Sequence, residues 1–301
     1  MQRIAALVLA LAVLTGCSPG PSTPPPAGST TPAVASDPPR PPPAERVLAS
    51  DPVRLADDLV SDERVLRGPA SPEDLLVAAA SRQQAAYRVL GRRPEWDPVA
   101  QPRIPPGLRA SYDRNVEARR ELTALSAGQA KATLPAWRII PPPPAPDLMR
   151  WYREAETMSG VGWSYLAAIN LIENGFGRIA GVSTAGAQGP MQFLPSTFAA
   201  YGSGGDINSP RDAIIAAGRF LDAHGFARDP DHALYRYNNS SHYVRAVRAY
   251  AAVLADDPEA FAGYYRWDVT YTTTAGDVVL PVGYAASAPI PVEQYRRTRP
   301  R

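Results

Sequence analysis

The residues from Leu166 to Phe198 constrain the fold more than any other part of the chain. They begin as an apolar helix that ends with one carboxylate, Glu173, and Asn174 and Gly175 then break the helix. Four more glycines follow in an irregular stretch: Gly177, Gly181, Gly186 and Gly189. Glycine allows a backbone to approach a ligand closely and to adopt conformations that other residues avoid. The pattern predicts an acid at a helix end, beside a loop that holds an extended substrate.

The N-terminus predicts export and a lipid anchor. The apolar run from Ile4 to Leu14 is too short to span a bilayer and is typical of a signal peptide. It leads into Leu14-Thr15-Gly16-Cys17, which resembles the bacterial lipobox, in which the chain is cut before a cysteine that then carries a lipid. Cys17 is the only cysteine, so an intramolecular disulfide is impossible. The alternative is an ordinary secretory signal followed by an accidental cysteine. We predict a lipoprotein signal peptide over residues 1–16 and lipidation of Cys17.

Proline divides the rest of the chain. The 34 prolines are concentrated in two places, the first of which is a Pro-, Ser- and Thr-rich segment over residues 17–43. This composition cannot bury a core and predicts a disordered tether. The second run, in a connection over residues 137–146, separates a helical arm at 44–136 from the main domain at 147–262. The arm contains no catalytic constellation, so we expect it to pack on the main domain; accessory glycan binding is the alternative.

Local signals place the helices and one hairpin. In the arm, Ser71 and Pro72 are expected to begin a helix that Gly91 ends, and a longer helix is expected from Leu108 to Leu125. The main domain should contain five helices, over about 147–158, 163–173, 210–224, 229–237 and 241–254. Residues 263–301 form a C-terminal extension, in which alternating apolar residues on both sides of Ala275-Gly276-Asp277 predict a short β-hairpin.

Glu173 has the surroundings of a general acid. Glycoside cleavage needs a proton on the leaving oxygen, and a carboxyl group beside apolar residues such as Ile172 and Phe176 keeps its proton at neutral pH. A hydrolase of the usual kind also needs a second carboxylate. No Asp or Glu lies between Asn174 and Gly205, and Asp206 is the first candidate after that gap. A reaction that uses one carboxylate and no water fits the gap.

From Trp151 to about Ala255 the chain resembles the lysozyme-like catalytic domain of the bacterial lytic transglycosylases. Three motifs in the family's order carry the resemblance: LAAI (166–169) through Glu173, STAGAQGPMQFLP (183–195) and ALYRYN (233–238). The segments 176–178 and 212–214 favour the membrane-bound lipoprotein type. The resemblance implies cleavage of the MurNAc–GlcNAc bond of peptidoglycan, leaving a 1,6-anhydroMurNAc end, with Glu173 as the single general acid and base.

The resemblance also assigns roles to six other residues. It implies that Ser183 and Gln192 hold hydroxyl and acetamido groups of the substrate, and that Met191 and Leu194 line the groove. It further implies that Tyr237 lies near Glu173 and that Asn238 supports the adjacent turn. Some of these residues can instead have purely structural roles. Gln192 can be a loop-bracing amide, and Met191 and Tyr237 can be core residues. A purely structural Glu173 is disfavoured because a negative charge at a helix C-terminus opposes the helix dipole.

Two residues depart from the family's pattern. Asn174 stands where a small hydroxyl residue commonly follows the catalytic acid, and Leu194 replaces a frequent methionine.

Other features of the sequence argue against cofactors and further partners. The segment 201–208 lacks the alternating acids of a calcium loop, and the three histidines are scattered, so we expect no metal and no cofactor. The net charge is only +2, and no basic cluster is interleaved with aromatic residues, so a nucleic-acid partner has little support and none is expected.

The expectation is therefore a mainly α protein: a lysozyme-like helical catalytic domain with an N-terminal helical arm and a short C-terminal β-hairpin. Its expected partners are peptidoglycan glycan strands and, through a lipid on Cys17, the outer face of the bacterial cell membrane, where it would act as a monomer facing the cell wall. Two alternatives remain open. One is a hydrolytic lysozyme-type muramidase in which Asp206 or Asp231 supplies the second carboxylate. The other is an envelope lipoprotein that binds glycan without cutting it.

Overall fold

The computed structural model describes residues 48–68 and 71–298. The predicted signal peptide, the lipidation site Cys17 and the tether over residues 17–43 lie outside this part of the chain. The described helices are α1 (Pro52–Leu66), α2 (Glu73–Arg92), α3 (Asp97–Ala100), α4 (Pro106–Leu125), α5 (Ala145–Ser159), α6 (Trp163–Asn174), α7 (Pro195–Tyr201), α8 (Pro210–Ala223), α9 (Pro230–Tyr237), α10 (Ser241–Asp256), α11 (Ala260–Arg266) and α12 (Val292–Thr298), with short 3-10 turns at Pro94–Trp96 and Gln101–Arg103. None of these helices is both long and apolar enough to cross a lipid bilayer.

The expected mainly α fold is confirmed, and side-chain caps explain where several helices begin. The Ser209 side chain accepts a hydrogen bond from the Asp212 backbone N–H at 3.3 Å and begins α8. The Asp229 side chain accepts one from the His232 N–H at 3.0 Å and begins α9. Such caps satisfy backbone donors that have no partner inside the helix.

Two expected boundaries of α2 are wrong. Ser71 does not cap this helix, because its hydroxyl donates instead to the Val65 carbonyl at the end of α1, at 2.9 Å. Gly91 does not end it, because α2 continues to Arg92. A Cβ atom at Gly91 would lie 2.7 Å from the Cβ of Arg119 on α4. This glycine therefore serves the close approach of two helices and not a helix stop.

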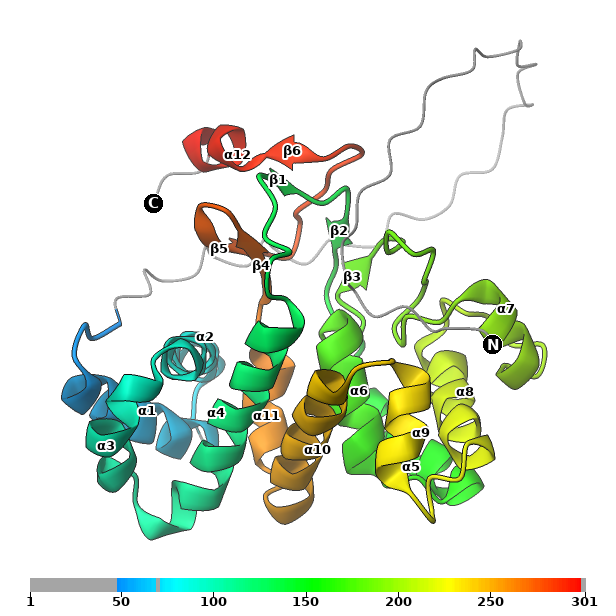
Figure 1. Cartoon of the computed structure of the whole chain (residues 1–301), viewed down its shortest axis with the longest axis horizontal. Coiled ribbons are helices and arrows are strands. Elements are labelled where there is room, and N and C mark those ends of the chain that lie inside the picture. Colours follow the sequence, from blue (N-terminus) through cyan, green and yellow to red (C-terminus); the bar gives the residue numbers. More distant parts are fainter. Residues whose placement is uncertain (1–47, 69–70, 299–301) are drawn as a thin grey trace.

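The helices of the arm and of the main domain share one hydrophobic core. Figure 1 shows α10 between α4 on one side and α6 on the other, and it packs against both. A continuous apolar cluster extends from Leu55 on α1 to Tyr264 and Trp267 at the end of α11. At its centre the Tyr264 hydroxyl donates to the Asn115 side-chain oxygen at 2.7 Å, which ties α11 to α4. The arm is thus packed directly against the helices that hold Glu173.

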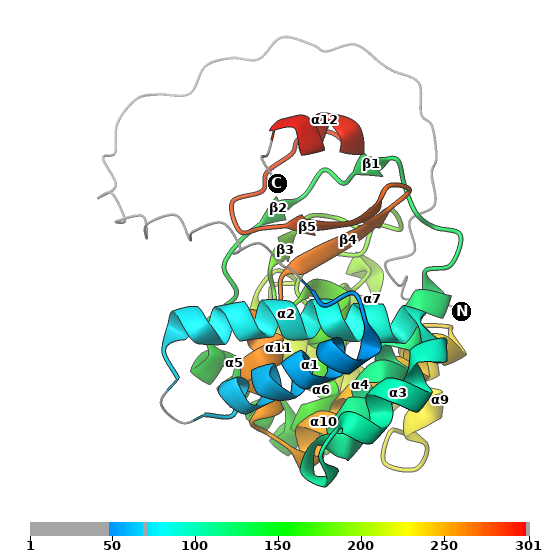
Figure 2. The same ribbon diagram turned by 90° about the vertical axis from the view of Figure 1, so that its left-hand side faces the viewer.

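The strands gather over one end of the helical layer (Figures 1 and 2). The expected hairpin is formed by β4 (Val269–Thr273) and β5 (Gly276–Leu280), which pair antiparallel with Val269 opposite Leu280. Two short pairs were not expected: β1 (Thr133–Leu134) with β6 (Ile290–Pro291), and β2 (Arg138–Ile139) with β3 (Ile179–Ala180). Together these strands enclose a second, smaller apolar cluster around Trp137, Tyr271 and Leu280.

The predicted domain boundaries remain predictions. One helix crosses a predicted boundary, and one strand lies inside the predicted connection. Helix α11 runs through the predicted boundary between residues 262 and 263. Strand β2 lies within the predicted connection over 137–146 and pairs with β3 of the main domain. The connection is therefore part of the folded structure in this region.

Candidate active site

Glu173 lies in the last turn of α6. The helix ends at Asn174 because Gly175 adopts the left-handed conformation, with φ of 60°, and its N–H bonds back into the last turn. The Asn174 amide then donates to the Ile179 carbonyl at 2.8 Å, and its oxygen accepts from the Ile179 N–H at 2.9 Å. Asn174, which stands where the family that the chain resembles commonly has a small hydroxyl residue, thus fastens the helix end to β3.

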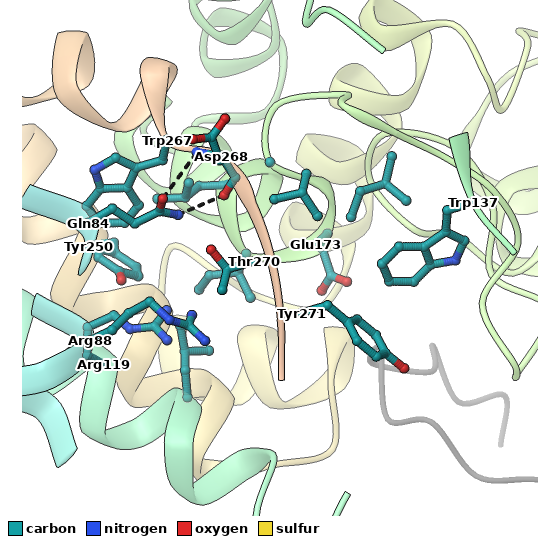
Figure 3. Close-up of a pocket in the computed structure, with 16 residues that line it drawn as sticks. Gln84, Arg88, Arg119, Trp137, Glu173, Tyr250, Trp267, Asp268, Thr270 and Tyr271 are labelled. Carbon is teal, nitrogen blue, oxygen red and sulfur yellow. Dashed lines mark hydrogen bonds between the residues drawn. The ribbon is translucent and has the colours of Figure 1, made fainter. Parts of the chain in front are cut away.

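Two adjoining cavities meet at Glu173. The first, of about 170 Å³, lies between the end of α6 and the hairpin, and Figure 3 shows Trp137 and Tyr271 on one side of the carboxyl group and Thr270 on the other. The second, of about 460 Å³, extends between α4, the start of α10 and the hairpin. Glu173 lines both cavities, although its residue surface is only 3% exposed. Its carboxyl group is therefore shielded from bulk water by the protein, yet it lies at the wall of both cavities.

Burial makes Glu173 a weak acid. Removal from water raises the pKa of Glu173 from 4.5 to about 8, and the nearby Tyr243 hydroxyl opposes this rise to a smaller extent. Within the described residues, neither Oε1 of Glu173 nor the Tyr243 hydroxyl has a geometric hydrogen-bond partner. A carboxyl group with these properties keeps its proton at neutral pH and has an atom free to meet a ligand. The arrangement suits a general acid.

The loop after α6 is held tightly against the core. Gly189 has φ of 72°, and a Cβ atom there would lie 1.9 Å from the Ile207 carbonyl oxygen, so only glycine fits. Phe193 and Gln188 exchange two backbone hydrogen bonds, of 2.8 and 3.0 Å. The Asn170 amide of α6 donates to the Pro190 carbonyl at 2.8 Å. This buried Asn170 was not predicted, and it fixes the loop to the helix that bears Glu173.

Ser183 and Gln192, the expected substrate contacts, brace this loop. The Ser183 hydroxyl accepts a hydrogen bond from the Ala187 N–H at 2.9 Å. The Gln192 amide donates to the Gly189 carbonyl at 2.9 Å, while its Oε1 is buried without a partner among the described residues. Neither residue lines the two cavities at Glu173.

The other four expected contacts are distributed between the core and the cavities. Met191 was expected to line the groove, but its side chain is fully buried in the core. Leu194 is half-buried, immediately before α7, and lines neither cavity. The Tyr237 hydroxyl donates to the Met191 carbonyl at 2.7 Å, and burial followed by the charge of nearby Glu173 raises the pKa of Tyr237. Asn238 lines the second cavity beside Glu173.

Sequence reasoning missed the residues that surround Glu173 from the arm and the hairpin. Gln84, Arg88 and Arg119 of the arm line the first cavity together with Thr270 and Tyr271 of β4 (Figure 3). The Gln84 side chain bonds both the backbone N–H and the carbonyl of Asp268, at 3.2 and 2.8 Å. One signal was available: Gln84 and Arg88 are four residues apart, on the face of α2 that also buries Ala80 and Tyr87.

The two carboxylates proposed for a hydrolytic mechanism lie away from these cavities. Asp206 accepts a hydrogen bond from the Asn208 N–H at 2.9 Å, and Asp231 pairs with Arg248 at 2.8 Å, and neither lines a cavity that contains Glu173. The acids that do are Asp268, whose carboxylate points away from Glu173 in Figure 3, and Asp277.

Asp277 forms ion pairs with two arginines. It pairs with Arg88 at 2.7 Å and with Arg92 at 2.8 Å. Burial alone would raise the pKa of Asp277, but the two guanidinium groups outweigh that effect and hold the pKa well below its usual value. Asp277 is therefore a weak base and joins the arm to the hairpin. Within residues 48–68 and 71–298, no three His, Cys, Asp or Glu side chains gather in a metal-binding arrangement.

Comparisons with known proteins agree with the resemblance. Residues 180–234 match the transglycosylase SLT domain family, a match that begins just after Glu173. The membrane-bound lytic murein transglycosylase F of Thiobacillus denitrificans is 31% identical to the chain over 125 residues, which cover 39% of this chain. The match spans about a quarter of that relative, 26% of its length. No solved structure matched the chain significantly.

Proposed function

We propose that this chain, which carries a transglycosylase SLT domain, is a lytic transglycosylase that cleaves the MurNAc–GlcNAc bond of peptidoglycan. The observation that carries the proposal is Glu173: a carboxyl group buried between two cavities, with its pKa raised to about 8. The family match at residues 180–234 and the name of the similar Thiobacillus protein support the substrate class.

Glu173 would serve both proton transfers. Its carboxyl group donates a proton to the glycosidic oxygen, and the bond from that oxygen to C1 of the muramoyl residue breaks. The carboxylate then accepts the proton of the C6 hydroxyl of the same sugar, and the C6 oxygen bonds to C1. The products are a 1,6-anhydroMurNAc end and a free GlcNAc hydroxyl, with Glu173 again protonated and no water consumed. The absence of a second carboxylate directed at Glu173 from the described cavity walls favours this sequence over hydrolysis.

The other expected site residues contact the substrate or hold the loop beside Glu173. Gln192, whose buried Oε1 has no partner among the described residues, is the candidate for an acetamido contact, and Asn238 is placed to meet a sugar in the second cavity. Ser183, Met191 and Leu194 act through the shape of the loop, and Tyr237 holds that loop beside Glu173 through the Met191 carbonyl.

The proposal includes a cellular location. A lipid on Cys17 and the tether over residues 17–43 would hold a monomer at the outer face of the bacterial cell membrane, facing the glycan strands. The similar Thiobacillus protein is named as membrane-bound, which supports an envelope location. Nucleic acid, a metal and a cofactor have no place in this scheme.

Product chemistry tests the function. Purified peptidoglycan is digested with the wild-type protein in heavy-oxygen water, and the muropeptides are analysed by mass spectrometry. Unlabelled anhydromuramoyl ends are expected. The Glu173→Gln variant should lose at least about 10²- to 10⁴-fold in rate, the usual loss on removal of a general acid. Asp206→Asn and Asp231→Asn are the matched controls and should stay near wild type. Labelled reducing ends would assign a hydrolase, and intact strands would assign a binding protein.

A further inference from the structure

We propose that Arg119, on helix α4 of the arm, is a substrate-binding residue that pairs with a carboxylate on the substituent of the muramoyl residue. The inference rests on the proposed function and adds a specificity site to it. It also gives the arm, for which the sequence favoured packing over accessory glycan binding, a direct part in substrate recognition.

The position of Arg119 is the first observation. Its side chain lines both cavities that meet at Glu173. Figure 3 shows it beside Arg88 in the first of them. A substrate group that occupies either cavity therefore lies in a space that this guanidinium group also lines. The backbone around Arg119 is fixed by the close approach of α2 at Gly91, so its side chain starts from a rigid position.

The second observation is that Arg119 has no counter-charge among the described residues. The residue is half-buried, yet its guanidinium group forms no ion pair with any residue that the structure describes. Its Nε is buried and has no hydrogen-bond partner there, and the group that the guanidinium meets is the neutral hydroxyl of Tyr250. A partly buried charge without a counter-charge costs free energy, and an incoming anion would recover that cost.

The local charge balance is the third observation. Three guanidinium groups, from Arg88, Arg92 and Arg119, line the second cavity against the carboxylate of Asp277. Glu173 adds no charge at neutral pH, since burial raises its pKa to about 8. Asp277 is already shared by Arg88 and Arg92, so within the described part of the chain it does not balance the charge of Arg119. Burial and then repulsion from Arg119 lower the pKa of Arg88 to about 10, so the Arg119 charge acts on this wall.

The chemistry of the wall selects a carboxylate. A guanidinium group offers planar, paired donors that match a carboxylate in a two-point contact. The sugar hydroxyl and acetamido groups of a glycan strand are neutral and do not need such a wall. The anionic groups of the strand are attached to the muramoyl residue. They are the lactyl carboxylate when the sugar is unsubstituted, and the free carboxylates of the stem peptide when it is substituted.

The test varies the enzyme and the substrate together. Arg119→Gln, Arg119→Lys and the control Arg64→Gln are compared with wild type. Arg64 is an exposed arginine on α1 that lines neither cavity. Four substrates are used: strands with stem peptides, strands stripped by an amidase so that the lactyl carboxylate is free, and each of these after coupling of its carboxylates to methylamine. KM and kcat are measured for each pair. Binding of the same strands is measured in the Glu173→Gln background, with and without Arg119→Gln.

A specific pattern is expected. Arg119→Gln should raise KM and weaken binding roughly 10- to 100-fold for carboxylate-bearing strands, the range for a hydrogen bond to a charged group. It should change little with the neutralised strands, and Arg119→Lys should fall between. The affected substrate identifies the source of the carboxylate. Equal losses on charged and neutralised strands, or an unchanged KM, would overturn the inference while leaving the lytic activity standing. A wild-type protein that cuts nothing, but whose binding still depends on Arg119 and on the carboxylate, would overturn only the proposed function.

Discussion

The unfolding free energy of the Glu173→Gln variant, measured relative to that of wild type, is expected to increase as the pH rises. The folded protein holds the Glu173 proton up to a pKa of about 8, whereas the unfolded chain loses it near 4.5. Between these values the folded state binds more protons, so the free energy of unfolding falls as the pH rises. The difference between 4.5 and about 8, at about 1.4 kcal/mol per pKa unit, corresponds to roughly 5 kcal/mol over the whole range. From pH 5 to pH 7 the contribution is up to about 3 kcal/mol.

Urea denaturation at pH 5, 6 and 7 measures this effect. The unfolding free energy of Glu173→Gln minus that of wild type should increase by up to about 3 kcal/mol from pH 5 to pH 7, because all other titrating groups cancel. The matched control is Glu117→Gln, an exposed glutamate on α4, which should change the unfolding free energy by no more than about 0.5 kcal/mol at each pH. A Glu173→Gln difference that stays constant with pH would refute the reasoning, since it would mean that the buried carboxyl group titrates as in water.

Three further predictions concern the rest of the chain. Asp277→Asn should lower the unfolding free energy by about 2 kcal/mol at pH 7, because two arginines lose their partner; the loss should shrink as the pH falls below the ordinary Asp value of 3.8, and equal urea midpoints at pH 7 would contradict it. A chain that starts at Pro141 lacks α4 and should melt at a much lower temperature by circular dichroism, since α10 then loses its neighbour; wild-type melting and cutting would show that the arm is dispensable. Cys17→Ser should release the protein from bacterial membranes into the soluble fraction, and unchanged membrane association on fractionation would exclude the lipid anchor.

Local signals in the sequence were sufficient for the parts of the fold that depend on neighbouring residues. The end of α6 at Asn174, the caps of α8 and α9 at Ser209 and Asp229, and the β4–β5 hairpin are all set within a few residues of chain. The position of Glu173 at a helix end beside apolar residues was predicted for the same reason. Its raised pKa follows from that position once the neighbouring helices bury it.

Contacts between distant segments explain what the sequence could not show. The ion pair between Arg88 and Asp277 joins residues 189 positions apart, and no local pattern announces it. Gly91 was mistaken for a helix stop because a close helix contact and a helix end select the same residue. Met191 was placed in the groove because an apolar residue in a motif fits a core equally well. The polar residues of the arm that line the cavities were missed because they come to the same cavities as Glu173 only in the folded chain.

The cause of the raised pKa at Glu173 determines how the site responds to its surroundings. The shift arises from removal of the carboxyl group from water, with a minor opposing effect from the Tyr243 hydroxyl, and not from charged neighbours. Ions in solution screen interactions between exposed charges over about 10 Å at 0.1 M salt, but they do not restore water to a buried group. The proton on Glu173 is therefore insulated from ionic strength. Salt would weaken the capture of an anionic substrate at the arginine-lined wall and leave the acid itself unchanged, so one site separates a salt-sensitive binding step from a salt-insensitive proton transfer.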